Sequence, residues 1–189
     1  GSNLHAHDYR AVGIPLILVK HIINGQIDDE NLDLVGEHKW AELQAYRLQE
    51  GDIVVTRVGR VGDSAYVFEQ NSGWFFSGQT LRVRLPINDR LHPRFLAYYY
   101  HLSQFNRQLE QFATGATRLS LNTELLASFK ILVPEYSVQL KYVELIKPID
   151  SIILTIKKQN RNLRQQRDLL LPRLISGELD VEALEIPTL

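Results

Sequence analysis

The chain contains no cysteine. Disulfide bridges, thiolate zinc sites and cysteine nucleophiles are therefore excluded, and the absence fits a reducing cytoplasm, where we expect the protein to act. No segment approaches the roughly 18 to 20 consecutive apolar residues of a membrane helix, so no membrane partner is expected. Positive charge is not in excess, because 21 Lys and Arg stand against 22 Asp and Glu. Any nucleic-acid contact must come from a local patch rather than from bulk charge.

Sequence patterns for catalysis are missing as well. Neither G-x-G-x-x-G nor G-x-x-x-x-G-K-[ST] occurs, which disfavours nucleotide binding. The six histidines are scattered without matching carboxylates, and a pair such as Asp28 and Asp29 is more typical of a loop than of catalytic acids. We therefore expect no metal and no cofactor on this chain.

Short runs rich in β-branched and aromatic residues, separated by turn residues, predict an α+β fold with a twisted, mainly antiparallel sheet. Apolar residues three or four apart predict packed helices, and Asn122 can cap the second of these. A looser spacing after residue 40 predicts another short helix. The strands are expected at 14–19, 53–57, 65–68, 80–85 and 129–133, and the helices at 40–48, 93–112 and 122–128.

The last third of the chain has the sharpest periodicity, because ten positions follow one another at strict intervals of four and three residues. Eight of the ten are apolar, and the other faces are mostly polar, which predicts a long helix with a coiled-coil seam. Pro148 is expected to bend or restart this helix, and Pro172 and Gly177 are expected to end it. The seam positions are Val138, Tyr142, Leu145, Ile149, Ile152, Ile156, Gln159, Leu163, Gln166 and Leu170.

Three segments combine side chains that suit DNA. In the first, Gly59 and Gly62 allow close approach of a phosphate, and Arg57 and Arg60 offer fork-shaped donors. An ordinary hairpin turn with solvated arginines explains this segment about equally well. As a lone pattern, the two glycines and two arginines are therefore only a weak indication of DNA contact.

The second and third segments leave the same choice open. Alternation in the predicted strand places two arginines on one face, and the preceding turn supplies amide and hydroxyl groups that can contact base edges. A surface charge ladder after a Ser/Gly turn is the alternative. The third segment precedes the capped helix and suits a phosphate, or is a simple connection. The residues concerned are Ser77, Gln79, Thr80, Arg82 and Arg84 in the second segment and Thr117 and Arg118 in the third.

Ordered blocks of the chain resemble the specificity subunits of type I restriction-modification systems. Residues 48–62, LQEGDIVVTRVGRVG, are similar to the family's kGDIl-x-x-r-x-G-x-x-G block, and 93–99 and 115–120 resemble p-x-f-l-x-y-y and G-[AS]-T-x-x-x-[LIS]. Residues 167–179, RDLLLPRLISGEL, resemble the rd-x-LLpkLlSGel close almost residue for residue. Two departures are the loose match of 134–139 to a P-x-x-e-Q opening and the lack of the usual strand and Gly turn before Tyr9.

The resemblance implies a non-catalytic DNA-recognition subunit. Residues 1–133 would be one target-recognition domain, 134–176 the conserved spacer and dimerisation helix, and 177–189 an acidic tail, with Gly1 and Ser2 typical of a cloning remnant. The expected partners are double-stranded DNA, a methyltransferase subunit, a restriction and translocase subunit, and a second copy paired antiparallel through the helix. S-adenosylmethionine, ATP and Mg²⁺ would belong only to the partner subunits.

Two other functions remain open on the sequence. One is a coiled-coil scaffold whose globular part binds protein without touching DNA. The other, an enzyme acting alone on DNA, is disfavoured because no nuclease or methyl-donor pattern is visible. The chain can be a natural half-length subunit or a piece of a longer one, and its DNA target cannot be named from loop residues alone.

Overall fold

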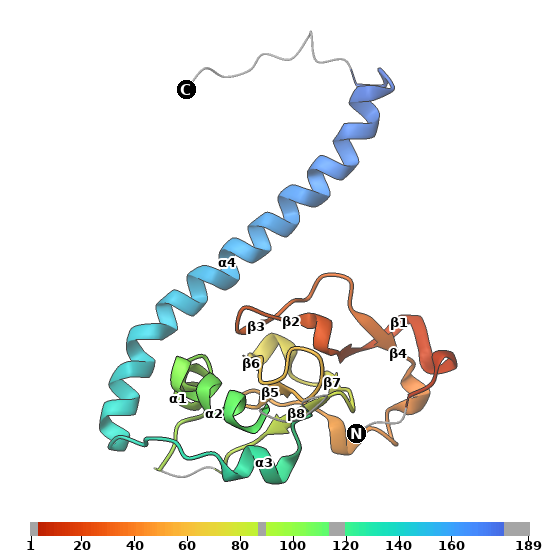
Figure 1. Cartoon of the computed structure of the whole chain (residues 1–189). Helices are drawn as coiled ribbons and strands as arrows, with labels where there is room; N and C mark the ends of the chain where they lie inside the picture. Colours follow the sequence, from red (N-terminus) through yellow and green to blue (C-terminus); the bar gives the residue numbers. More distant parts are fainter. Residues whose placement is uncertain (1–3, 87–89, 114–119, 180–189) are drawn as a thin grey trace, which may run out of the picture. The chain divides into compact units, whose positions relative to one another are not determined.

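The computed structural model describes residues 4–86, 90–113 and 120–179 (Figure 1). Two compact units divide the chain, Gly1–Lys141 and Tyr142–Leu189, which we call the head unit and the helical unit. The head unit combines small sheets with short helices, and a long helix follows it, which confirms the predicted α+β class. The first turn of that helix lies within the head unit.

The N-terminal part of the head unit forms a small sheet and a hairpin. Strand β1 (Tyr9–Ile17) pairs antiparallel with β4 (Asp33–Val35) and parallel with β7 (Phe75–Phe76), in the order β4-β1-β7. The expected strand at 14–19 is therefore longer at its start and ends two residues earlier. Between β2 (Ile22–Ile23) and β3 (Gln26–Ile27), Asn24 and Gly25 have φ of 49° and 80°, as a tight hairpin turn requires.

A second, fully antiparallel sheet lies at the centre of the head unit. Its strands are β6 (Ser64–Tyr66), β5 (Ile53–Thr56) and β8 (Thr80–Val83), in the order β6-β5-β8. All three were predicted within two residues at each end. The side chains of β5 are buried along its whole length, because the strand has a neighbour on both edges and packed side chains on both faces.

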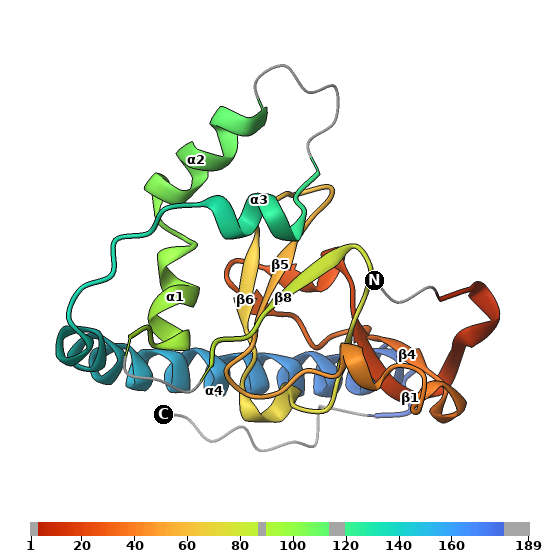
Figure 2. The same ribbon diagram turned by 90° about the horizontal axis from the view of Figure 1, so that it is seen from below.

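The alternation of β5 divides the apolar interior into separate clusters. Ile53 and Val55 belong to the cluster formed with the helices, and Val54 belongs to the cluster formed with Ile17 and Leu48. Figure 2 shows β5 between β6 and β8, with helices α1, α2 and α3 gathered beside this sheet. The central strand thus contributes to two cores.

Three short helices cover the central sheet: α1 (Pro93–Tyr99), α2 (Ser103–Ala113) and α3 (Thr123–Ser128). The predicted helical stretch at 93–112 is therefore interrupted at 100–102. The predicted cap of α3 is confirmed, since Asn122 Oδ1 accepts a hydrogen bond of 2.7 Å from the amide of Leu125.

Two predicted elements are wrong. Residues 129–133 form no strand, because the side chain of Gln108 takes the place of a neighbouring strand: it donates to the carbonyl of Lys130 at 3.0 Å and accepts from its amide at 3.2 Å. The stretch at 40–48 contains the single 3₁₀ turn η4 (Gln44–Tyr46), preceded by η3 (Glu37–Lys39), instead of an α-helix. The remaining 3₁₀ turns are η1 (Ala6–Asp8), η2 (Val19–His21) and η5 (Glu69–Asn71).

The long helix α4 runs from Tyr136 to Ile175 and confirms the element that the seam predicted. It continues through Pro148 and Pro172, so the expected stop at Pro172 is wrong. The helix ends at Ile175, and Gly177 then turns the chain with a φ of 72° while its amide donates to the carbonyl of Leu174 at 3.2 Å. Across the described residues, no helix combines the length and apolar character needed to span a bilayer.

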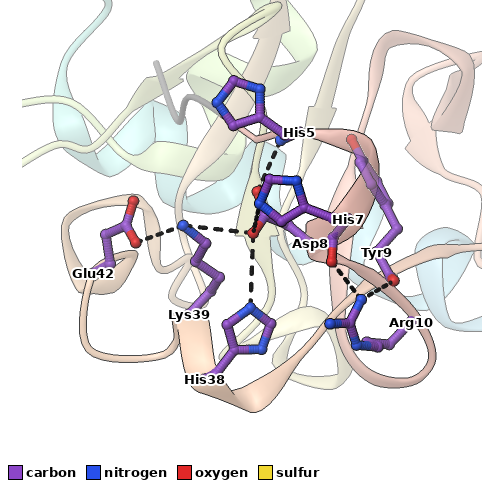
Figure 3. Close-up of polar contacts among 8 residues, drawn as sticks. All are labelled: His5, His7, Asp8, Tyr9, Arg10, His38, Lys39 and Glu42. Carbon is purple, nitrogen blue, oxygen red and sulfur yellow. Dashed lines mark hydrogen bonds and ion pairs between the residues drawn. The ribbon is translucent and has the colours of Figure 1, made fainter.

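A buried carboxylate, Asp8, ties the start of β1 to η3 (Figure 3). Its Oδ2 accepts a 2.8 Å hydrogen bond from the amide of His5, and its Oδ1 lies 3.5 Å from Lys39 Nζ and 3.7 Å from His38 Nε2. The hydrogen bond from His5 lowers the pKa of Asp8 most, burial opposes that shift, and the charge of Lys39 lowers the pKa further.

Gly62→Ala tests the close packing of α2 on the turn after β5. Gly62 has a φ of 91°, and an added Cβ would lie 2.1 Å from Leu109 Cδ1. We expect the free energy of unfolding to fall by about 3 kcal/mol, from backbone strain plus overlap. The control Gly51→Ala has a φ of 90° with open space around it and should lose only about 1 kcal/mol. Equal losses in urea denaturation would contradict the packing.

Asp8→Asn tests the buried carboxylate. Because the pKa of Asp8 is lowered in the folded state, its ionised form stabilises the fold above the ordinary value of 3.8, and that contribution disappears as the pH falls through the lower folded pKa. The variant should have a lower Tm near pH 7 and a flatter decline of Tm below about pH 4. Asp168→Asn, at an exposed position of α4, should keep the parent's pH profile. Identical profiles for all three proteins would rule out the role.

Candidate nucleic-acid interface

Strand register brings two of the predicted DNA-contacting segments to the same end of the central sheet. Thr56, the last residue of β5, pairs with Thr80, the first residue of β8. Since the strands are antiparallel, the turn after β5 (residues 57–63) and the turn before β8 (residues 77–79) leave the sheet side by side. We call these two turns the loop end.

Arg57 connects the turns to each other and to the chain that enters α3. Its amide donates to the carbonyl of Gln79 at 3.1 Å, and its guanidinium reaches the carbonyl of Gly78 at 3.5 Å. Its own carbonyl accepts a 2.8 Å hydrogen bond from the amide of Leu121. Figure 2 shows the turn between β5 and β6 beside the segment that leads into α3.

The turn after β5 presents one exposed arginine. Gly59 and Arg60 are exposed, whereas Gly62 is buried against Leu109. Arg60 forms an ion pair of 3.0 Å with Asp63 on the same turn, and its guanidinium also donates to the carbonyls of Val19 and Ile22. Gly62 is therefore needed for the packing of the turn against Leu109. The exposed charge of Arg60 is already partly balanced by Asp63.

The turn before β8 is held by buried hydroxyl residues and presents an exposed amide. The amide and the hydroxyl of Thr80 both donate to the carbonyl of Ser77, at 3.1 and 3.0 Å, and both residues are buried. Gln79 is exposed. Of the predicted residues in this turn, Gln79 is the one whose side chain faces solvent.

The third predicted segment, with Thr117 and Arg118, lies outside the described residues. The described chain resumes at Ser120, and Leu121 bonds to Arg57. Leu121 therefore lies beside the loop end. A DNA contact by Thr117 or Arg118 stays a prediction.

Arg82 and Arg84 lie away from the loop end. Arg84 follows Val83, which pairs with the first residue of β5, and its guanidinium makes two hydrogen bonds of 2.7 and 2.6 Å with the buried carboxylate of Asp52. Arg82 Nη1 donates to the carbonyls of Ala45 and Arg47 at 3.1 and 3.0 Å. Both arginines thus hold the 45–52 segment onto β8.

The pKa values of these two arginines shift in opposite directions. The hydrogen bond that Arg84 donates to Asp52 raises the pKa of Arg84, whereas burial and the neighbouring charge of Arg84 lower the pKa of Arg82. A guanidinium group stays protonated in proteins, so both arginines carry charge at neutral pH. Their DNA contacts stay a prediction, and the contacts that the structure shows are within the protein.

The predicted seam of α4 is exposed along its length. Leu145 and Leu163 are 72% and 61% exposed, and both glutamines of the seam are exposed too. A row of aliphatic side chains in water is unfavourable by about 25 cal/mol per Å² of apolar area. The other exposed seam residues are Val138, Tyr142, Ile149, Ile152, Ile156 and Leu170.

Comparison with known proteins decides which family this architecture represents. A family model, type I restriction modification DNA specificity domain, matches residues 33–165. The chain belongs to this family. The match includes both turns of the loop end and most of the seam.

Individual relatives of the specificity domain agree with this assignment. Two type I restriction enzyme specificity subunits of Methanocaldococcus jannaschii, MjaX and MjaIX, are 24% and 25% identical over 87% and 97% of the chain. A crystal structure of the type I restriction-modification S subunit from M. genitalium superposes with a TM-score of 0.64 at 18% identity over 92% of the chain, which shows a shared fold. The chain spans 40% and 42% of the two curated relatives and 41% of that structure.

The sequence interpretation missed Gln139, which anchors the start of α4 in the specificity domain. Its side chain is fully buried. Gln139 Oε1 accepts a 2.8 Å hydrogen bond from the amide of His92, and Nε2 donates to the carbonyls of Arg90 and Pro134 at 2.9 and 2.8 Å. The only sequence signal was its position as the Q of the loosely matched P-x-x-e-Q segment.

A polar hollow on α2 was missed as well. It has a volume of about 480 Å³, and its lining residues Gln104, Arg107, Gln108 and Gln111 recur at three or four positions, with Lys130 opposite. That spacing places them on one helix face, so the sequence did contain the signal. The described residues hold no group of three or more His, Cys, Asp or Glu side chains arranged to bind a metal ion.

Gln139→Ala tests the anchor of α4. The substitution leaves the amide of His92 and two carbonyls without their buried partner, so we expect the free energy of unfolding to fall by about 3 kcal/mol. Gln165→Ala removes the same side chain from an exposed position of the same helix and should change stability by less than about 0.5 kcal/mol. Urea denaturation followed by circular dichroism compares them. A neutral Gln139→Ala would refute the anchor.

Proposed function

We propose that this chain is a DNA-recognition unit of a type I restriction-modification specificity subunit and that its loop end contacts double-stranded DNA. The observation that supports this most is that Arg57, in the turn after β5, bonds to Gly78 and Gln79 of the turn before β8 and to Leu121 ahead of α3. Clustered loops on a rigid sheet are the usual place for recognition residues. Gln79 and Arg60 are the exposed groups best suited to base edges and phosphates.

The modest charge of the chain fits a short recognition site. With a net charge of -1, the surface does not attract DNA over a long range, so affinity must depend on a few contacts at the loop end. Asp63, beside Arg60, reduces the local positive charge further. One such head would contact one half of a bipartite target.

The seam of α4 supports the second part of the proposal, that two chains pair through these helices. Exposed aliphatic residues at intervals of four and three are buried most readily by another helix of the same kind. Antiparallel pairing by two-fold symmetry would present two identical heads and require an inverted, interrupted target.

Partner subunits would supply the chemistry. In this proposal the methyltransferase and restriction subunits dock on the paired helices in the cytoplasm and carry S-adenosylmethionine, ATP and Mg²⁺. The chain itself contributes recognition and spacing and no catalytic group. The resemblance of the closing segment 167–179 to the family pattern supports this docking role.

A scaffold without DNA contact is the second candidate. It is favoured by the internal partners of Arg82 and Arg84, which leave fewer arginines for DNA than the sequence predicted. Measuring binding of the purified chain to a duplex pool, with and without the methyltransferase subunit, separates the candidates. A scaffold would give no DNA binding of its own.

Opposite charge changes on one turn test the DNA surface. Arg57→Gln with Arg60→Gln should weaken duplex binding about tenfold or more and flatten the dependence of log K on log salt. Asp63→Asn, which releases the Arg60 ion pair, should strengthen binding several-fold at low salt.

Fluorescence anisotropy at several salt concentrations provides the measurement. Lys157→Gln with Arg161→Gln on α4 is the control, with the same loss of charge at residues outside the loop end, and it should leave binding within twofold. Equal effects of the two double variants would contradict the assigned surface, and folding of each variant is checked by its Tm.

A further inference from the structure

The polar hollow on α2 lies outside the loop end, and its lining is positively charged. We propose that the hollow binds one phosphate group of the DNA backbone and so adds a contact that positions the head unit on the duplex. This contact rests on the proposed function, DNA binding at the loop end. The residues that line the hollow are Gln104, Arg107, Gln108, Gln111 and Lys130.

The lining of the hollow suits an anion rather than a metal ion. It contains two positive side chains, Arg107 and Lys130, together with three glutamines, and no carboxylate. Of the side chains that the structure describes, no acidic one pairs with either cation. Phosphate oxygens accept hydrogen bonds from guanidinium, ammonium and amide groups alike. A phosphate group therefore matches every polar side chain of the hollow.

The two positive residues are held at the hollow by neighbouring groups. Arg107 Nε and Nη2 donate to the carbonyl and the hydroxyl of Ser103, one turn earlier on α2, at 3.4 and 3.3 Å. A guanidinium has more N–H donors than these two bonds use. The two bonds between the side chain of Gln108 and the backbone of Lys130 fix the stretch after α3 beside α2 (Figure 2). The cations of two segments thus meet at one hollow.

The openness of the hollow favours a phosphate on a polymer over a small free anion. Gln104, Arg107, Gln111 and Lys130 are exposed, so a single ion would keep much of its water and gain little. A phosphodiester of a duplex that is already bound at the loop end has a high effective concentration at the hollow. Weak individual bonds then add to the affinity of the whole complex.

The packing of α2 sets the distance between the hollow and the loop end. Leu109 is buried and faces Gly62 of the turn after β5. Arg107 and Gln111 are each two residues from Leu109, about 200° around the helix, so the hollow opens on the far side of α2. One helix with its side chains is about 10 Å thick, comparable to the roughly 12 Å width of the major groove. A duplex that lies across the turn and α2, with its groove at the loop end, brings a bordering strand to the hollow.

Arg107→Gln with Lys130→Gln tests the charge of the hollow. The variant should bind a duplex pool several-fold more weakly at low salt, and the slope of log K against log salt should fall by about one, because one phosphate contact is lost. The base preference of the bound duplexes should stay the same, since phosphate contacts carry no base information. Fluorescence anisotropy at several salt concentrations gives the slope, and sequencing of the bound pool gives the preference.

Lys141→Gln with Lys147→Gln is the matched control for the charge test. It removes the same charge from exposed positions that do not line the hollow. The control should keep the parent's slope and affinity, and the Tm of each variant checks its folding. Equal losses in the two double variants would show an effect of overall charge and would reject the hollow as a site.

A DNA-cleaving reagent attached to the hollow tests contact independently of affinity. The chain contains no cysteine, so Gln111→Cys provides a single attachment point for iron-EDTA. On a duplex selected from the pool, the reagent should cut the backbone at one fixed offset from the preferred bases. Gln70→Cys is the control, since it is exposed and follows β6 at the opposite end of the central sheet from the loop end. It should give no cleavage above background.

The other outcomes separate this contact from the proposed function. An unchanged salt slope in the Arg107 and Lys130 variant, or no cleavage from position 111, removes DNA from the hollow while binding at the loop end stands. If that variant keeps the slope but loses binding of inorganic phosphate in calorimetry, the hollow takes a free anion and the DNA contact is rejected. A parent chain that binds no duplex rejects the proposed function and the phosphate contact together.

Discussion

Strand β5 is the constraint on which the head unit depends. It is hydrogen-bonded on both edges, its four side chains are buried, and its two faces contribute to different apolar clusters. A strand held in this way has one register, because a shift by one residue would exchange its faces. The positions of the turns that leave it, and of every residue bonded to Arg57, follow from that register.

Local patterns predicted the parts of the fold that local physics decides. The three strands of the central sheet, the cap at Asn122 and the length of α4 depend on neighbouring residues or on spacing within one segment. The strand expected at 129–133 failed because its would-be neighbour is a side chain, Gln108, from another helix. The helix expected at 40–48 failed because its apolar residues pack in short turns against separate parts of the head unit.

The sequence predicted which segments form the candidate site, but it did not predict which groups their side chains contact. Alternation placed Arg82 and Arg84 on one face, but only tertiary structure shows that Asp52 and two carbonyls occupy that face. Conversely, Gln139 gave almost no signal, because a buried amide is recognisable only once Arg90, His92 and Pro134 are brought around it. Residues far apart in sequence decide whether a polar side chain recognises DNA or stabilises the fold.

The joint at Gln139 and the loop end respond to different solution conditions. Bonds between a neutral amide and backbone groups in a buried site are barely screened by ions, whereas attraction between guanidinium groups and phosphates weakens steeply as ionic strength rises. In the proposed recognition role, salt would therefore release DNA from the loop end while the bonds of Gln139 at the start of α4 stay in place. If the loop end is the DNA surface, the chain would leave one duplex and bind another without loss of the buried joint between α4 and the head unit.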